Sequence, residues 1–119
     1  MVVNRAIDGM EWYAVRCIFK DDESAVFEER ITVWRRGSME LAIEAAESEA
    51  LRYIRHIQFT YTGLAQGYRL FGDSADSLTG EIGDGQEVFS LCRLSNLSTN
   101  DYLSQFFDTG SEIQNSAKH

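Results

Sequence analysis

Two runs of alternating side chains, separated by a short polar stretch, constrain the fold of this chain more than any other feature. The first run extends from about Trp12 to Lys20 and the second from Ala25 to Arg36, and both are rich in β-branched and aromatic residues. Such alternation is typical of strands that bury one face. The residues between them, Asp-Asp-Glu-Ser at 21–24, suit a tight polar turn. The pattern therefore predicts a β-hairpin.

After Gly37 the spacing of the apolar residues changes to three and four, which predicts a helix over about Met39–Ile57. Ser38 is a suitable N-cap. Acidic residues precede basic ones along the segment, as the helix dipole prefers. The apolar positions form one stripe: Ala42, Ile43, Ala46, Ala50, Tyr53, Ile54 and Ile57. Of these, Ile43, Ala46, Ala50 and Ile54 should face the sheet.

Two further strands are predicted downstream of this helix. The segment Phe59–Asp73 has the composition of a strand but contains Gly63 and Gly67, which indicate a bulge or a close approach of another backbone. The stretch Gly72–Gln86 is predicted to be a long acidic hairpin loop, and Gln86–Leu94 the last strand.

The C-terminal part contains one short predicted helix. Ser98 is placed as its N-cap, and the helix is expected to end near Phe107. Residues 111–119 are expected to be a frayed tail, which leaves residues 1–110 as one domain. The order β-β-α-β-β-α predicts an α+β fold of two layers. In it, a four-stranded antiparallel sheet carries the long helix packed on one face, together with the short C-terminal helix.

The charge distribution favours some partners over others. The chain has a formal net charge of −8, and residues 73–119 carry eight acids against two bases. Such a surface repels nucleic acid and anionic lipid, so neither is an expected partner, whereas a basic protein is. The acidic loop is the candidate docking surface, through the side chains of Asp73, Asp76, Glu81 and Asp84.

The sequence also bears on the compartment. No run approaches the roughly 20 apolar residues of a membrane span, and the N-terminus lacks the apolar core of a secretion signal, so the cytoplasm is the expected location. Cys17 and Cys92 both lie in predicted strands, which favours small buried side chains over a disulfide, although a disulfide between neighbouring strands stays open.

Motifs of catalysis or metal binding are weak in this chain. The hexapeptide Phe-Phe-Asp-Thr-Gly-Ser at 106–111 matches the local signature of aspartic proteases, but only a few residues follow it, so Asp108 and Gly110 are interpreted as residues that end a helix. Cys17, His56 and Cys92 are isolated in sequence, unlike zinc ligands. No catalytic residue, metal or cofactor is therefore predicted.

One set of residues is typical of protein interfaces. If the core face of the hairpin carries Tyr13, Val15 and Phe19 together with Ile31 and Val33, the opposite face collects two tryptophans, two arginines and a glutamate. Tryptophan and arginine are enriched at interface hot spots. A set of cross-strand charge pairs that shield apolar rings is the alternative. The candidate interface residues are Trp12, Arg16, Glu28, Arg30 and Trp34.

Four short segments resemble one family. They are WYAVRCIFKDD, EERITVW, the helix segment EAAESEA and GQEVFSLCRLS, in that order along about Glu11–Ser95. They resemble the small bacterial family catalogued as domain of unknown function 4288. The resemblance implies the same order of strands and helix. It implies no known reaction, and so assigns no catalytic residue.

Two functions remain as hypotheses. The first is a non-catalytic protein-binding module, accessory or immunity-like, that forms a homodimer or binds a basic partner. The second is a small-molecule-binding or enzymatic domain with a pocket between the sheet and the helix. The candidate pocket residues are Tyr68, Arg69, Glu87 and Ser90, because they are polar positions inside the last two strands.

Overall fold

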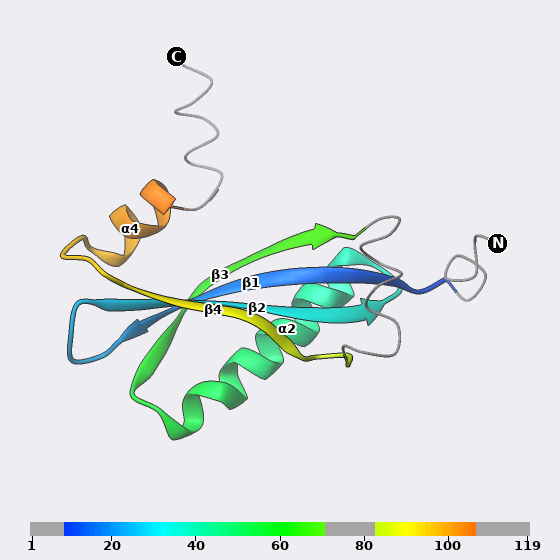
Figure 1. Ribbon diagram of the computed structural model, residues 1–119, viewed down its shortest axis with the longest axis horizontal. Helices are drawn as coiled ribbons and strands as arrows, with labels where there is room; N and C mark the ends of the chain where they lie inside the picture. Colours follow the sequence, from blue (N-terminus) through cyan, green and yellow to red (C-terminus); the bar gives the residue numbers. More distant parts are fainter. Residues whose placement is uncertain (1–8, 71–82, 107–119) are drawn as a thin grey trace, which may run out of the picture.

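The computed structural model describes residues 9–70 and 83–106, and these form a mixed α+β fold (Figure 1). A four-stranded antiparallel sheet has the order β3-β1-β2-β4, so the first hairpin occupies its centre. The expected fold class and the order of elements are confirmed. The elements are β1 (Glu11–Asp21), β2 (Val26–Arg36), α2 (Met39–Tyr53), the 3-10 turn η1 (Ile54–His56), β3 (Phe59–Arg69), β4 (Glu87–Leu94) and α4 (Thr99–Phe106).

Both helices begin at the predicted caps. The hydroxyl of Ser38 accepts a hydrogen bond from the backbone N–H of Leu41 at 3.2 Å, and that of Ser98 accepts one from Asp101 at 3.2 Å. Each bond satisfies one of the N–H groups that a helix start leaves without an internal partner. The expected tail at 111–119, the residues Asp108 and Gly110, and most of the acidic loop lie outside the described residues.

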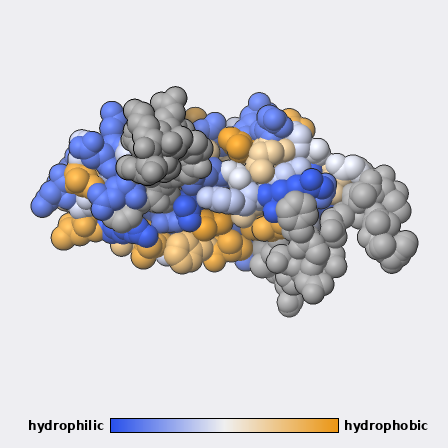
Figure 2. Space-filling view, turned by 90° about the horizontal axis from the view of Figure 1, so that it is seen from above, coloured by the Kyte–Doolittle hydropathy of each residue, from blue (hydrophilic) through white to orange (hydrophobic). Residues whose placement is uncertain are grey.

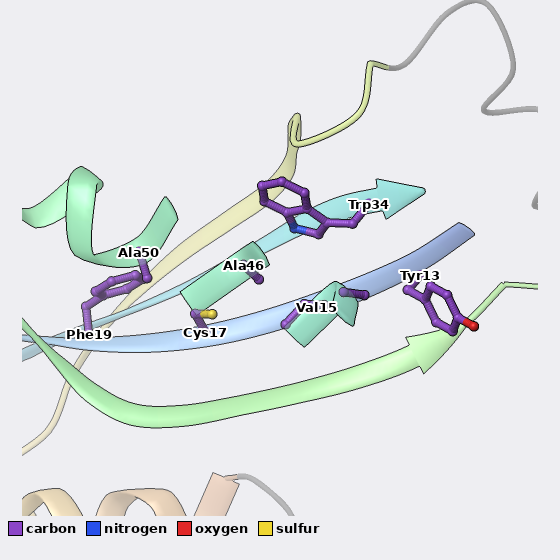
Figure 3. Close-up of a cluster of buried hydrophobic side chains, with 8 residues drawn as sticks. Tyr13, Val15, Cys17, Phe19, Trp34, Ala46 and Ala50 are labelled. Carbon is purple, nitrogen blue, oxygen red and sulfur yellow. The ribbon is translucent and has the colours of Figure 1, made fainter. Parts of the chain in front are cut away.

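Helix α2 packs on the sheet through small side chains. Ala42, Ala46 and Ala50 are buried, and Figure 3 shows Ala46 and Ala50 beside the row of β1 side chains. Alanine at these positions lets the helix axis approach the sheet closely, so the larger side chains come from the strands. The resulting core contains Tyr13, Val15, Cys17, Phe19 and Trp34, with Ile43, Ile54, Phe59, Tyr61 and Ala65 among the partly buried residues packed against it.

The two glycines of β3 act as expected. Gly63 has φ +90° at the point where the β1–β3 register shifts, which marks a bulge. At Gly67 an added Cβ would collide with the sulfur of Met39 and lie 3.3 Å from Ile43. The absence of a side chain there therefore permits α2 to lie on β3.

The expected facing of β2 was wrong. Tyr13 pairs with Trp34, Cys17 with Arg30 and Phe19 with Glu28, so odd residues of β1 share a face with even residues of β2. The helix therefore covers Glu28, Arg30, Thr32 and Trp34, rather than Ile31 and Val33. Alternation identifies the two faces of each strand, but the turn decides which faces coincide, and a shift of one residue exchanges them.

The face of the sheet away from α2 is also partly covered. Ile18 and Phe27 pack with Tyr102 of α4, and the rings of Phe27 and Tyr102 stack with centroids 3.8 Å apart. Farther along this face, Trp12 and Val33 are buried in a separate small cluster. The central strands β1 and β2 therefore have buried residues on both faces.

Candidate functional site

The five residues of the expected interface do not form one patch. Trp12 and Arg16 lie on the face away from α2, whereas Glu28, Arg30 and Trp34 lie beneath the helix. Both tryptophans are buried within the chain, at 8% and 6% exposure. The geometric premise of that interface, two exposed tryptophans side by side, is therefore wrong.

Arg30 is the centre of a polar cluster between α2 and the β2–β4 half of the sheet. Its side chain is buried, and it donates hydrogen bonds to Glu87 at 2.6 Å and to Glu49 at 2.9 Å. Its guanidinium carbon lies 3.7 Å from the centroid of the Tyr53 ring. A buried charge needs such partners, because an uncompensated guanidinium away from water is costly.

Glu28 is the second buried charge of this cluster. Its carboxylate accepts hydrogen bonds from the hydroxyls of Tyr53 at 2.8 Å and Ser90 at 3.2 Å. Burial and the bond to Glu28 together raise the pKa of Tyr53 to about 12, so the phenol is protonated at neutral pH. Glu28 and Arg30 thus have protein partners from α2 and β4, which fits a role in joining the helix to the sheet.

The four candidate pocket residues fall at opposite edges of the sheet. Glu87 and Ser90 lie on β4, beside the Arg30 cluster, whereas Tyr68 and Arg69 lie on β3. Tyr68 donates to the side chain of Gln66, and Arg69 forms an ion pair with Glu11. Because β1 and β2 separate the two edges, these residues do not line one pocket, and that prediction was wrong.

Of the four acids in the expected docking loop, Asp84 alone lies among the described residues. Its carboxylate accepts a hydrogen bond from the backbone N–H of Arg35 at 2.8 Å and forms an ion pair with Arg36 at 2.8 Å. These bonds hold the turn before β4 against the end of β2. Asp84 is thus committed to a local structural contact, while Asp73, Asp76 and Glu81 lie outside the described residues.

Strand β4 carries a surface that the sequence did not single out. It pairs with β2 on one side, and among the described strands none lies on its other side. Four of the eight exposed large hydrophobic residues of the described chain fall within this eight-residue strand. They are Val88, Phe89, Leu91 and Leu94, which are between 37% and 80% exposed.

The space-filling view agrees with an uneven distribution of apolar surface. Seen from above, hydrophobic residues form a row along one long side of the described part, with smaller hydrophobic groups elsewhere among hydrophilic residues (Figure 2). Half of the exposed large hydrophobic residues of the described chain thus lie on one edge strand, and exposed apolar surface of this kind commonly marks an interaction site.

The backbone of β4 has a defined direction of hydrogen bonding. The N–H of Ser95 donates to the carbonyl of Ala25 at 2.8 Å, and hydrogen-bonded pairs alternate along an antiparallel ladder. With the observed register, the polar backbone groups of Phe89, Leu91 and Arg93 point toward β2. Those of Ser90, Cys92 and Leu94 consequently point outward, away from the sheet.

The thiols differ between the centre and the edge of the sheet. Both cysteines are free, Cys17 being buried and Cys92 exposed, so the expectation of burial is wrong for Cys92. Burial raises the pKa of Cys17 to about 12. Partial desolvation by the surrounding residues, and next the nearby charge of Glu28, also raise the pKa of the exposed Cys92 thiol. Neither thiol has the lowered pKa of a reactive nucleophile.

Comparison with known proteins assigns no function to these residues. No family model matches the chain, and neither the curated proteins nor the solved structures contain a match. Within residues 9–70 and 83–106, no three His, Cys, Asp or Glu side chains lie together as metal ligands would. No helix in the described segments is both long and apolar enough to cross a membrane.

Proposed function

We propose that this protein is a non-catalytic protein-binding module whose binding element is the outer edge of β4. The observation that carries the proposal is the coincidence, on one strand, of outward backbone donors and acceptors with exposed apolar side chains. An extended segment of another chain can pair with such an edge through main-chain hydrogen bonds, while its side chains cover the apolar ones.

The composition of β4 supports this role. Natural sheets protect their edges with lysine, proline, bulges or covering elements, because an open edge pairs readily with other chains. The strand contains neither lysine nor proline, and its register shift lies at its start, opposite Ile31 and Thr32. From Phe89 to Leu94 the ladder is regular, so this span offers six residues for pairing.

The polar cluster beneath α2 also supports binding over catalysis. Arg30 and Glu28 hold Glu87 and Ser90 from the inner side, which fixes the position of β4 relative to the helix. A strand that receives a partner benefits from such fixation, because less conformational entropy is lost on binding. The alternative of a small-molecule pocket has no comparable support, because its four residues lie apart.

A photo-crosslinking amino acid at Leu94 tests the proposal in cells that produce the protein. We expect an adduct with a polypeptide, and its loss when Cys92→Pro is added, because proline removes an outward N–H without touching the β2 ladder. Cys92→Ser is the matched control and should retain the adduct. The same crosslinker at Glu44, on the exposed side of α2, should give none. An adduct that survives Cys92→Pro, or none from Leu94, would contradict the proposal.

A further inference from the structure

We infer that the partner of β4 is the β4 strand of a second copy of this chain, paired antiparallel about a two-fold axis at Leu91. The inference rests on the proposed binding function of the strand and names its occupant. The evidence consists of the direction of the backbone groups, the regular span of the ladder and the side chains that would meet.

The backbone limits the possible registers. Outward groups belong to Ser90, Cys92 and Leu94, so these residues must pair with the same set in the second copy. Because the register shift at the start of β4 interrupts regular pairing, the usable span begins at Phe89. The two symmetric registers that pair most of that span centre on Leu91, pairing Ser90 with the partner's Cys92, or on Cys92 itself.

The side chains distinguish these two registers. With the axis at Leu91, Leu91 meets its own copy and Phe89 lies opposite the partner's Arg93, on the face of the sheet away from α2. Apolar cross-strand pairs stabilise a sheet, and the alkyl part of Arg93, whose guanidinium lies 3.8 Å from Glu29 of its own chain, can cover the ring of Phe89. With the axis at Cys92, Leu91 would lie opposite Arg93, and Phe89 opposite Ser95. The first register therefore covers more of the exposed apolar surface.

The local charge favours a second copy over a basic partner. The whole chain carries a formal charge of −8, which would oppose self-association through most of its surface. Strand β4, however, contains one acid, Glu87, and one base, Arg93, so its formal charge is zero. Each is already held within its own chain, Glu87 by Arg30 and Arg93 near Glu29. A strongly basic segment would find no excess of acid on this strand.

Disulfide trapping tests the register. In a Cys92→Ser background, Leu91→Cys should form a covalent dimer on mild oxidation, because residues facing each other at a non-hydrogen-bonded position have Cα atoms about 4.5 Å apart. Arg93→Cys in the same background is the matched control on the same strand face. Its two copies would lie about 14 Å apart, beyond the reach of a disulfide, so we expect at most a trace of dimer.

Light scattering of the unmodified protein measures whether it is a dimer in solution. Together with the trapping result, it shows which inference fails: the second copy as partner, or the axis at Leu91. A dimer with selective trapping through Leu91→Cys supports both inferences. A dimer that is trapped instead through native Cys92 in the wild-type chain overturns the axis at Leu91 and leaves strand pairing intact. A monomer at all accessible concentrations, with no trapping, overturns the second copy as occupant. If the Leu94 crosslinker then captures a different polypeptide, the proposed function stands.

Discussion

The two edges of the sheet, β3 and β4, differ in almost every property that controls strand pairing. β3 lies under α2, carries a glycine bulge at Gly63 and exposes mainly polar groups or tyrosine. β4 has its regular span at the outer edge and exposes Val88, Phe89, Leu91 and Leu94. The contrast shows that one edge of this sheet has the features that prevent intermolecular pairing, and the other lacks them.

The difference follows from where α2 lies on the sheet. The helix packs over β3, β1 and β2, and its contact with β3 is close because Gly67 has no side chain. On the β4 side the helix reaches the sheet through long polar side chains, Glu49 and Tyr53, which bind Arg30 and Glu28. Apolar burial therefore dominates the β3 side, where Tyr61 also donates a hydrogen bond to Glu47 at 2.6 Å, and a hydrogen-bonded network around two buried charges joins the β4 side.

The largest expected difference in stability is between truncating a phenylalanine in the core and truncating one on β4. Phe19 is fully buried against Tyr53 and Tyr61, whereas Phe89 on β4 is 45% exposed. Phe19→Ala should lower the free energy of unfolding by about 3–5 kcal/mol, and Phe89→Ala by about 1 kcal/mol at concentrations where the protein is monomeric. Urea unfolding of both variants measures the difference. Comparable losses would mean that β4 contributes to the core of the monomer.

An intermediate effect is expected where α2 meets β3. Gly67→Ala would place a methyl group against Met39 and Ile43, so we expect a loss of about 1–3 kcal/mol, reduced to the extent that Met39 moves. Gly37→Ala is the control, since its nearest contact would be an ordinary 3.7 Å. Thermal unfolding should show a clearly lower midpoint for Gly67→Ala alone. Equal midpoints would contradict the close packing of α2 on β3.

The smallest expected effect concerns the link from α2 to β4. Tyr53→Phe removes the shorter hydrogen bond to Glu28, which should cost about 1 kcal/mol at pH 8, and Ser90→Ala should cost less because Tyr53 still donates. If Ser90→Ala lowers the free energy of unfolding more than Tyr53→Phe does, the hydrogen bond from Ser90 of β4 holds Glu28 more strongly than the one from Tyr53.

The same tyrosine gives this link a dependence on pH. The pKa of Tyr53 rises from 10.0 to about 12 on folding, so the folded state retains the proton more tightly than the unfolded state. The contribution of protonated Tyr53 to the free energy of unfolding is fully present below pH 10 and is lost as the pH rises toward 12. Unfolding measured across this range should show a decline in stability that is shallower in Tyr53→Phe. An unchanged slope would contradict the raised pKa.

Much of the fold could be predicted because it depends on local pattern. The alternation of β1, the period of α2, the caps Ser38 and Ser98 and the bulge at Gly63 each have a cause within a few residues. Element ends shifted slightly, as where the helical segment tightens into a 3-10 turn after Tyr53.

The candidate sites could not be predicted because they depend on non-local relations. The turn after β1 decides that Arg30 faces Cys17, and alternation alone is equally consistent with the opposite facing. The strand order decides that Tyr68 and Ser90 lie at opposite edges, and nothing in either strand specifies its neighbours. The apolar side chains of β4 were visible in the sequence, but an edge position was not.

The strand order has a consequence for the order in which the sheet can form during synthesis on the ribosome. β4 pairs with β2, although α2 and β3 lie between them in the chain. At about 5–20 residues per second, the 58 residues that follow Arg36, up to Leu94, take roughly 3–12 s to synthesise. During that time the hydrogen-bonding edge of β2 has no strand of its own chain to receive. The sheet is therefore completed on its β2 side only after α2 and β3 have both been synthesised.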